Sequence, residues 1–462
     1  MITFLVMGLS SVRGDIVFTT LFSFTGTGGS YPGGAPFCGL TPGSDGNLYG
    51  TTTSGGSNNL GTLFKVTTGG AFTSLLSFNG TNGSAPYAAL ALGKDNNFYG
   101  TTFRGGPSNW GTVFEYTAGG TFTNLFSFTG TNNAYQGANP ASPLVPAADG
   151  SFYGTANFGG LTNAAYQGSG YGSVFQLTAS GSLVAPALFA NTNGAHPSGG
   201  MILGQDGNFY GTTTWGGLGI NGTTFPGYGT VFKMTPDGTF TNIYKFTGGA
   251  DGGFIYAGLV QGRDGYLYGS AFSGGAEGYG TVFKVSTNGS FVLLHSFISY
   301  DSGSPYGGMT QGSDGNFYGT TYGAYVPYGS IFRVTPDGAF TNLFFFHGTD
   351  GDHPDGVLVQ GPDGNFYGTT STGGGSGLGT VFQLSVPLAP EITALTQTNG
   401  TVTVTWSSVA GQSYQLQYID DLKQPAWSFV TKSTTASGGT MNAIDSDYPA
   451  ASGQRFYRVA LQ

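Results

Sequence analysis

The sequence predicts an all-β protein, in which a seven-bladed β-propeller of four-stranded blades is closed by an N-terminal strand and followed by a small β-sandwich. Three observations predict this fold class. A short motif recurs seven times at a spacing typical of propeller blades, each repeat carries four short apolar runs, and one of those runs is moved from the end of the repeats to their start. The 86 glycines, 27 tyrosines and 38 phenylalanines also favour turns and strands over helices.

The recurring motif marks one hairpin in every repeat. It reads DGNLYGTT at Asp45, and its later copies begin at Asp95, Asp149, Asp206, Asp264, Asp314 and Asp363, at intervals of 50, 54, 57, 58, 50 and 49 residues. A short apolar piece such as GVLVQ precedes each copy, and runs such as GTVF and FTNLFSF follow it. No stretch shows the helical period, so each unit is predicted to hold four strands, A to D.

The position of the D strands predicts how the ring closes. A D strand is missing after Val386, whereas a spare copy, VFTTLFSF, occupies residues 17–24 ahead of the first full repeat. In a closed propeller this N-terminal strand would complete the last blade and leave no exposed sheet edge. A solenoid would have no use for such an offset, because its terminal repeats act as caps.

The lengths of the connections separate the two faces of the ring. The A–B and C–D hairpins keep constant lengths, whereas the B–C connections measure 11, 11, 18, 18, 11, 10 and 11 residues and the D–A connections also vary. Antiparallel strands place the B–C and D–A connections on one face, here called the variable face. Loops on a rigid scaffold commonly carry function, so we expect a site on this face, first of all in the longest loops, 154–172 and 211–229.

Composition divides the chain into three predicted segments. Residues 1–14 include the apolar stretch ITFLVMGL and are predicted to be either a signal-peptide remnant or an N-terminal arm, residues 15–387 form the propeller, and residues 388–462 follow a Pro-containing linker. The last segment has five strand-like runs and resembles a fibronectin type III or immunoglobulin-like module, with Trp406 and Tyr414 in its core.

The blade pattern GLVQGxDGNxYGTTxxGG, followed by GTVFKVTPDG and FTNLFSF, resembles the glycine-rich GloVer (Gloeo_Verruco) tandem repeat of verrucomicrobia and similar bacteria. The resemblance covers roughly residues 15–386 and rests on seven copies of the motif. It implies an exported propeller, secreted or on the cell surface, and assigns no catalytic residue. The third repeat departs from the pattern in its D strand, which reads SLVAPALF.

The motif aspartate is predicted to shape a turn rather than to bind calcium. A loop with one carboxylate, one amide and a following apolar residue offers too few of the six to eight oxygens that calcium needs. Asp-Gly and Asn-Gly pairs are strong hairpin signals, because glycine adopts positive φ and Asp or Asn tolerates it.

Aromatic side chains in the B–C connections are the candidate ligand-binding residues. An aromatic ring presents an apolar face that can stack on a sugar, and neighbouring amides can bind its hydroxyls. We therefore expect a binding or scaffold protein that recognises polysaccharide through this face. The alternative is that these rings only pack the loops onto the blades. The selected residues are Trp110, Tyr171, Trp215, Tyr228, Tyr279 and Tyr328.

Acidic residues in the D–A connections suggest a second hypothesis. The stretch HGTDGDHPDG contains Asp350, Asp352, His353 and Asp355, and the two preceding D–A connections supply Asp251 and Asp301. If Asp251, Asp301, Asp350 and Asp352 converged on the axis, they could form a metal site or the acid–base pair of a carbohydrate-active or quinoprotein-like enzyme. The alternative is that they are ordinary polar turn residues.

Several function classes are disfavoured by what the sequence lacks. The net charge is −9 and no basic cluster exists, which argues against a nucleic-acid partner. P-loop, G-x-S-x-G, HExxH and CxxC motifs are absent, so no cofactor is expected. The single Cys38 permits no internal disulfide, no segment is long enough to span a bilayer, and we expect a monomer.

Overall fold

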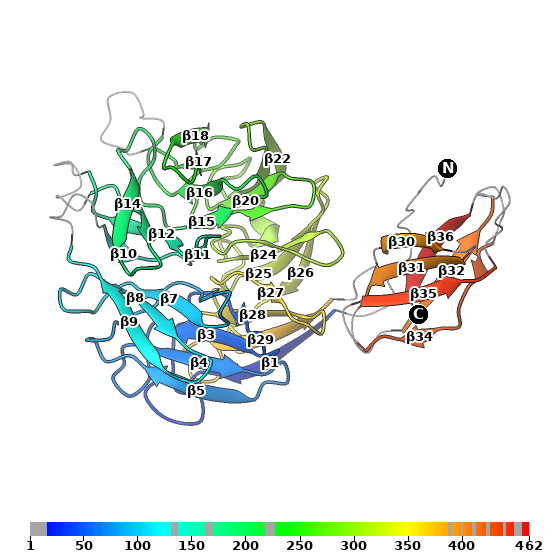
Figure 1. The fold of residues 1–462 in the computed structure, drawn as a ribbon, viewed down its shortest axis with the longest axis horizontal. Coiled ribbons are helices and arrows are strands. Elements are labelled where there is room, and N and C mark those ends of the chain that lie inside the picture. The colour runs from blue at the N-terminus through cyan, green and yellow to red at the C-terminus, as the bar shows by residue number, and fades with distance from the viewer. Residues whose placement is uncertain are drawn as a thin grey trace.

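The structure consists of a ring of seven antiparallel sheets and two further small sheets at the C-terminal end (Figure 1). It is a computed structural model, and it describes residues 16–130, 137–161, 170–217, 227–386, 390, 392–398, 401–408, 413–421, 426–437, 440–447 and 455–461. The predicted segment 1–14, the 387/388 boundary and parts of both long loops lie outside these ranges. Within them, no helix has the length and apolar character needed to cross a bilayer.

The first three blades follow the predicted A-to-D order. Blade 1 contains β2 (Thr41–Pro42), β3 (Leu48–Thr52), β4 (Thr62–Val66) and β5 (Phe72–Ser77), and blade 2 contains β6 (Ala91–Leu92), β7 (Phe98–Thr102), β8 (Thr112–Tyr116) and β9 (Phe122–Ser127). Blade 3 contains β10 (Ala138–Pro140), β11 (Val145–Pro146), β12 (Phe152–Phe158), β13 (Ser173–Leu177) and β14 (Leu183–Leu188). Its A strand is in two pieces, because β10 and β11 both pair with β12. The unusual sequence of β14 still forms a regular D strand beside β13.

The next three blades repeat the same arrangement. Blade 4 contains β15 (Met201–Leu203), β16 (Phe209–Thr213), β17 (Thr230–Met234) and β18 (Phe240–Lys245). Blade 5 contains β19 (Val260–Gln261), β20 (Leu267–Ala271), β21 (Thr281–Val285) and β22 (Phe291–Ser296). Blade 6 contains β23 (Thr310–Gln311), β24 (Phe317–Thr321), β25 (Ser330–Val334) and β26 (Phe340–Phe345), preceded by a 3₁₀ turn, η2 (Ser299–Asp301).

Blade 7 is closed by the N-terminal strand, as the sequence predicts. It contains β27 (Val359–Gln360), β28 (Phe366–Thr370) and β29 (Thr380–Ser385), and β1 (Val17–Ser23) is its outermost strand. The pairing of β1 with β29 has a register shift between Thr20 and Phe22, and a shift also interrupts the C–D pairing of the other six blades. The blue β1 therefore takes the place of strand D beside β29 in Figure 1.

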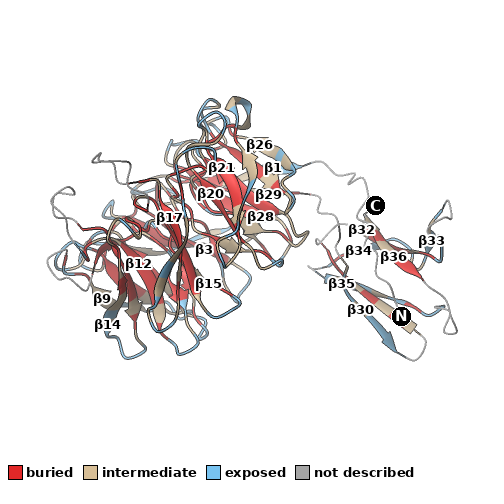
Figure 2. Cartoon of the chain, turned by 90° about the horizontal axis from the view of Figure 1, so that it is seen from above, coloured by how far each residue is buried: buried red, intermediate tan, exposed pale blue. Residues whose placement is uncertain are grey.

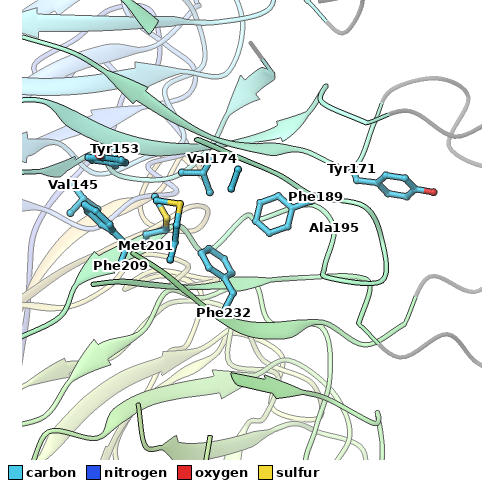
Figure 3. Close-up of a cluster of buried hydrophobic side chains, with 11 residues drawn as sticks. Val145, Tyr153, Tyr171, Val174, Phe189, Ala195, Met201, Phe209 and Phe232 are labelled. Atoms are coloured by element: carbon cyan, nitrogen blue, oxygen red, sulfur yellow. The ribbon is translucent and has the colours of Figure 1, made fainter. Parts of the chain in front are cut away.

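The core of the ring lies between neighbouring blades. The strands of the blades carry most of the buried residues, and the connections carry most of the exposed ones (Figure 2). Between blades 3 and 4, Val174 and Phe189 pack with Phe209 and Phe232, and Figure 3 shows this cluster. Apolar side chains on each blade thus pack against those of the next blade, which explains why the ring has to close to bury all of them.

The repeated motif stabilises this arrangement in a way that the turn interpretation only partly anticipates. In blade 1, Asp45 accepts hydrogen bonds from the backbone N–H of Asn47 at 3.1 Å and from the hydroxyl of Tyr49 at 2.9 Å. The ring of Tyr49 then stacks on Phe98 of the next blade, with 4.0 Å between centroids. The aspartate therefore shapes the turn and also orients a tyrosine that joins two blades.

The C-terminal strands form two small sheets around a shared core. One sheet contains β30 (Ile392–Thr398), β31 (Thr401–Ser407) and β35 (Thr440–Asp445), and the other contains β32 (Ser413–Ile419), β33 (Ser428–Phe429), β34 (Thr434–Thr435) and β36 (Phe456–Leu461). Trp406 and Tyr414, from different sheets, are 2% and 1% exposed in this core, as the sequence predicts.

Candidate functional site

A cavity of about 460 Å³ lies at the centre of the ring and is lined by residues from all seven blades. Most of its lining precedes the innermost strands or belongs to their first residues, such as Cys38 and Gly39 ahead of β2. These positions end the D–A connections, so this axial cavity belongs to the variable face. Its volume falls within the ~300–1,000 Å³ typical of small-ligand sites.

Two glycines of the cavity lining lie where neighbouring blades approach each other closely. A Cβ atom on Gly39 would lie 2.4 Å from the backbone oxygen of Val357, and one on Gly199 would lie 2.3 Å from that of Ala257. Side chains at these two positions would collide with the neighbouring backbone, so glycine permits this close approach.

Seven equivalent residues, one from each blade, surround the axial cavity, and we call them the axial ring. Each lies three residues before the Leu or Met that leads into or begins strand A. The members, in order from blade 1 to blade 7, are Phe37, Tyr87, Ala141, Ser198, Tyr256, Tyr306 and Asp355. Their neighbours in sequence are similar from blade to blade, whereas the ring residue itself changes from aromatic to small to acidic. Such variation on a constant framework is typical of a binding site.

Aromatic side chains occupy two arcs of the axial ring. Tyr256 and Tyr306 stack with 4.9 Å between centroids and 18° between planes, and Phe37 lies 5.2 Å from Tyr87. A fifth lining ring, Phe103, meets Tyr87 edge-on at 5.1 Å. All five are partly exposed, so their ring surfaces are available to a ligand. In blades 3 and 4 the ring residues are the small Ala141 and Ser198.

Among the described residues that line the axial cavity, Asp355 is the charged one. Its side chain is buried, with 5% exposure; Oδ2 accepts a 2.5 Å hydrogen bond from the Ser371 hydroxyl, while Oδ1 has no hydrogen-bond partner. Burial raises the pKa of Asp355 to about 7, and the nearby charge of Asp352 acts in the same direction. At neutral pH the carboxyl group is therefore divided between its protonated and ionised forms.

Other polar groups in the lining extend the chemistry of the site. Asn157 lines the cavity opposite blade 7, and its buried Oδ1 also has no hydrogen-bond partner. Burial, aided by the charge of Asp355, raises the pKa of Tyr306 to about 12, so this hydroxyl stays neutral and can donate a hydrogen bond. Burial likewise raises the pKa of Cys38, whose thiol lies 3.1 Å from Thr51 Oγ1. The cavity thus offers aromatic faces, neutral donors and acceptor oxygens.

The six aromatic residues selected from the sequence lie on the variable face but outside the lining of the axial cavity. Trp110 and Tyr328 are 36% and 40% exposed; Trp215, Tyr228 and Tyr279 are half-buried, and Tyr171 is buried. In Figure 3, Tyr171 stands at the outer end of its cluster with its hydroxyl pointing away from the other side chains.

A packing role accounts for five of these six residues. Trp110, Tyr171, Tyr228, Tyr279 and Tyr328 each precede the first glycine of a C strand, where the remaining two blades have Leu60 and Leu378. A Cβ atom on Gly248 would lie 2.4 Å from the ring of Tyr228, and one on Gly348 would lie 3.3 Å from that of Tyr328. The side chains of Trp110, Tyr228, Tyr279 and Tyr328 therefore cover glycines of the following D–A turn, whereas Tyr171 packs in a buried cluster. The leucines at equivalent positions are the sequence signal for a packing role.

Three of the four acidic candidates accept a backbone N–H of their own connection. Asp251, Asp301 and Asp350 accept the backbone N–H of Thr247, Ile298 and His347 at 2.9, 3.3 and 2.8 Å. Asn82 and Asn193 bind the corresponding N–H groups in two other blades, so the position caps a turn whether or not it is charged. Asp352 lies 3.1 Å from His353. Among the described residues, no group of three or more His, Cys, Asp or Glu is arranged to hold a metal ion.

Solved structures with a similar fold include proteins of different kinds. The BP39L lectin from Burkholderia pseudomallei aligns with a TM-score of 0.51 at 9% identity, covering 82% of this chain and 97% of that one. The extracellular domain of a protein described as a hybrid two component system from B. thetaiotaomicron gives 0.49 at 11% identity; the alignment covers 95% of this chain but only 57% of that one. A gluconolactonase from Xanthomonas campestris gives 0.41 at 15%, over 80% and 90% of the two chains. The similarity to the lectin supports the propeller fold.

The family comparison is more specific than the structural ones. No curated protein sequence matches this chain. The Gloeobacter/Verrucomicrobia repeat matches residues 9–168 and 225–441, which together are more than half of the sequence. The matched segments contain the recurring motif and six of the seven positions of the axial ring. The chain therefore belongs to the Gloeobacter/Verrucomicrobia repeat family.

Proposed function

We propose that this chain is an exported or cell-surface binding protein that recognises polysaccharide in the axial cavity of its variable face. The observation that carries the proposal is the axial ring, in which four aromatic side chains and one carboxyl group from different blades converge on one cavity. The residues named from the sequence lie on the same face, but the cavity is lined by their neighbours nearer the axis.

The chemistry of the lining suits a sugar ring. Pyranose rings have apolar faces that pack against aromatic side chains, and Tyr256 and Tyr306 present such surfaces next to each other. Sugar hydroxyls need hydrogen-bond partners once they leave water, and two residues of the lining, Asn157 and Asp355, each hold a buried acceptor oxygen that has no hydrogen-bond partner among the described residues. A cavity of about 460 Å³ would hold a short segment of a chain rather than a long one.

The proposed location follows from composition and from the family. The repeat occurs in bacterial proteins that the sequence resemblance implies are exported, and a chain with only 13 Lys and Arg residues and 22 acids is compatible with export. We propose that the two C-terminal sheets form a fibronectin type III-like module that spaces the propeller from other parts of the cell surface, with the chain acting as a monomer.

The alternative function is a carbohydrate-active or quinoprotein-like enzyme with an acidic axial site. A glycoside hydrolase would need two carboxyl groups ~5–10 Å apart on either side of the scissile bond. The lining of the axial cavity contains one, Asp355, while Asp251, Asp301, Asp350 and Asp352 lie outside it. Binding without hydrolysis is thus the function that this geometry favours.

A glycan array tests the proposal directly. We expect the wild-type chain to bind a subset of polysaccharides, and we expect Tyr256→Ala and Tyr306→Ala to weaken that binding about tenfold or more, because each loses a stacking surface. Tyr325→Ala is the matched control, since Tyr325 is 69% exposed in a B–C connection and does not line the cavity. Equal loss in the control, or no glycan binding by the wild type, would contradict the proposal.

A further inference from the structure

The surroundings of Asp355 narrow the class of ligand. In the order of the blades, blade 7 stands between the pair Tyr256 and Tyr306 of blades 5 and 6 and the pair Phe37 and Tyr87 of blades 1 and 2. The carboxyl group therefore lies between the two aromatic arcs of the axial ring. We propose that the axial cavity binds a saccharide that carries an ammonium group, with Asp355 as its counter-ion. This inference rests on the proposed function and adds to it the charge of the ligand.

The chain itself shows what a buried carboxylate normally requires. Asp445, which is 3% exposed in the C-terminal core, lies 2.8 Å from the guanidinium of Arg455 and also accepts the hydroxyl of Tyr457. Asp355 is buried to a similar degree, yet its one hydrogen-bond partner is the neutral hydroxyl of Ser371. An uncompensated buried charge is costly. A positively charged group on a ligand would therefore stabilise the ionised form of Asp355.

The rest of the cavity is suited to a positive charge and unsuited to a negative one. Of the residues that the structure describes, no Lys, Arg or His lines the cavity. The two arcs contribute four partly exposed aromatic rings, and cations are attracted to the faces of such rings, most strongly where water is excluded. An anionic sugar would meet Asp355, the nearby Asp352 and a chain of net charge −9. Uronic, sulfated and phosphorylated saccharides are therefore expected to bind poorly.

The ionisation of the site is consistent with this chemistry. The titratable groups around Asp355 are Asp352, Tyr306, Tyr322 and Cys38, together with His353, which contacts Asp352. None of them supplies a fixed positive charge next to the carboxyl group. A bound ammonium group would favour the ionised form of Asp355 and so lower its pKa from about 7. In the absence of ligand, the protonated form of Asp355 avoids an unpaired buried charge.

The test compares three oligosaccharides that share the same β-1,4 backbone: oligomers of glucosamine, of N-acetylglucosamine and of glucose. We expect calorimetry at pH 7 to show that the wild type binds the glucosamine oligomer about tenfold more tightly than either neutral oligomer. Asp355→Asn should remove that preference while keeping weak binding to all three, because the aromatic arcs remain. Asp350→Asn is the matched control, since Asp350 lies outside the cavity and Asn occupies the equivalent position in blade 1.

The outcomes separate this inference from the proposed function. If the wild type binds all three oligomers equally, or if Asp355→Asn keeps the preference, the ammonium inference is wrong and the proposed function stands. If the wild type binds glycans on the array but not the glucosamine oligomer, the ammonium inference is again wrong and the proposed function stands. If the wild type binds no saccharide at all, both are wrong.

Discussion

Single side chains in this protein combine turn formation with contacts between blades. The carboxylate of Asp314 accepts the backbone N–H of Asn316 and the hydroxyl of Tyr318 at 2.8 Å, and Tyr318 packs against Phe366 of the next blade. Burial and the hydrogen bond to the carboxylate hold the pKa of Tyr318 far above its usual range, so the phenol remains a donor. The motif is thus conserved from blade to blade within this chain for structural reasons.

At the residue scale, Asp355 gives a prediction about stability. Because its pKa is raised to about 7 in the folded chain, folded molecules keep a proton between about pH 4 and 7 that unfolded molecules have released. The raised pKa of Asp355 costs the folded chain nothing below about pH 4. As the pH rises from about 4 through 7, the free energy of unfolding falls by an amount on the order of 2–4 kcal/mol.

The variant Asp355→Asn has no such dependence and retains an amide oxygen for Ser371. We expect the variant to gain stability relative to the wild type as the pH is raised from 4 to 8, by the amount just given. Urea denaturation at several pH values measures the difference between the two proteins. A difference that stays constant with pH would show that Asp355 titrates normally in the folded chain.

At the scale of single elements, β1 connects three blades. Phe18 stacks on Phe344 of blade 6 with 3.9 Å between centroids and lies 5.3 Å from Phe382 in its own blade. Phe24, directly after β1, is fully buried and lies 5.3 Å from Phe64 of blade 1. The N-terminal strand therefore completes the core on both sides of blade 7 as well as the sheet itself.

Removal of one of these rings should destabilise the whole propeller. Phe24→Ala is expected to lower the free energy of unfolding by about 3–5 kcal/mol, because it leaves a cavity where the ring closes. Val17→Ala, in the same strand but 53% exposed, should change it by less than about 0.5 kcal/mol. Urea unfolding of the two variants provides the comparison, and equal midpoints would mean that β1 is dispensable for closure.

Particular elements show why the blades could be predicted from the sequence. Repetition reveals equivalent positions, so one hairpin beginning at Asp45 defines the other six, and the displaced strand at residues 17–24 identifies the closure. Local hydrogen bonding and the alternation of apolar residues are set by neighbours in the chain, and such patterns are readable without coordinates.

The axial cavity could not be predicted in the same way. Whether a loop residue points to the axis or covers a glycine depends on the tilt and spacing of seven blades, which no local pattern encodes. The sequence suggests Trp110 and Tyr328 as candidates because they are aromatic residues in variable loops, whereas Tyr256 and Tyr306 lie just before strand A, where no local pattern distinguishes them. Equivalent positions in the seven repeats do carry a signal. Leu60 and Leu378 stand where other blades have aromatic residues, which indicates a packing role, and Asp355 is the acidic member of a set of positions that are otherwise aromatic or small.

At the scale of the whole molecule, ring closure creates the site. No blade contributes more than a small arc, and the sheet–sheet packing that buries the core also fixes the seven ring residues around one axis. Changes at these positions would alter the cavity and, where ring residues contact each other as Tyr256 and Tyr306 do, the contacts between neighbouring blades as well.

The central claim is that the axial cavity, rather than the outer loops, is the binding site. A crystal structure of the chain with the glycan that binds best on the array tests it most directly. We expect a sugar ring within van der Waals contact of Tyr256 or Tyr306 and within hydrogen-bonding distance of Asp355. A glycan bound instead at Trp110 or Tyr328, or on the C-terminal sheets, with the axial cavity empty, would contradict it.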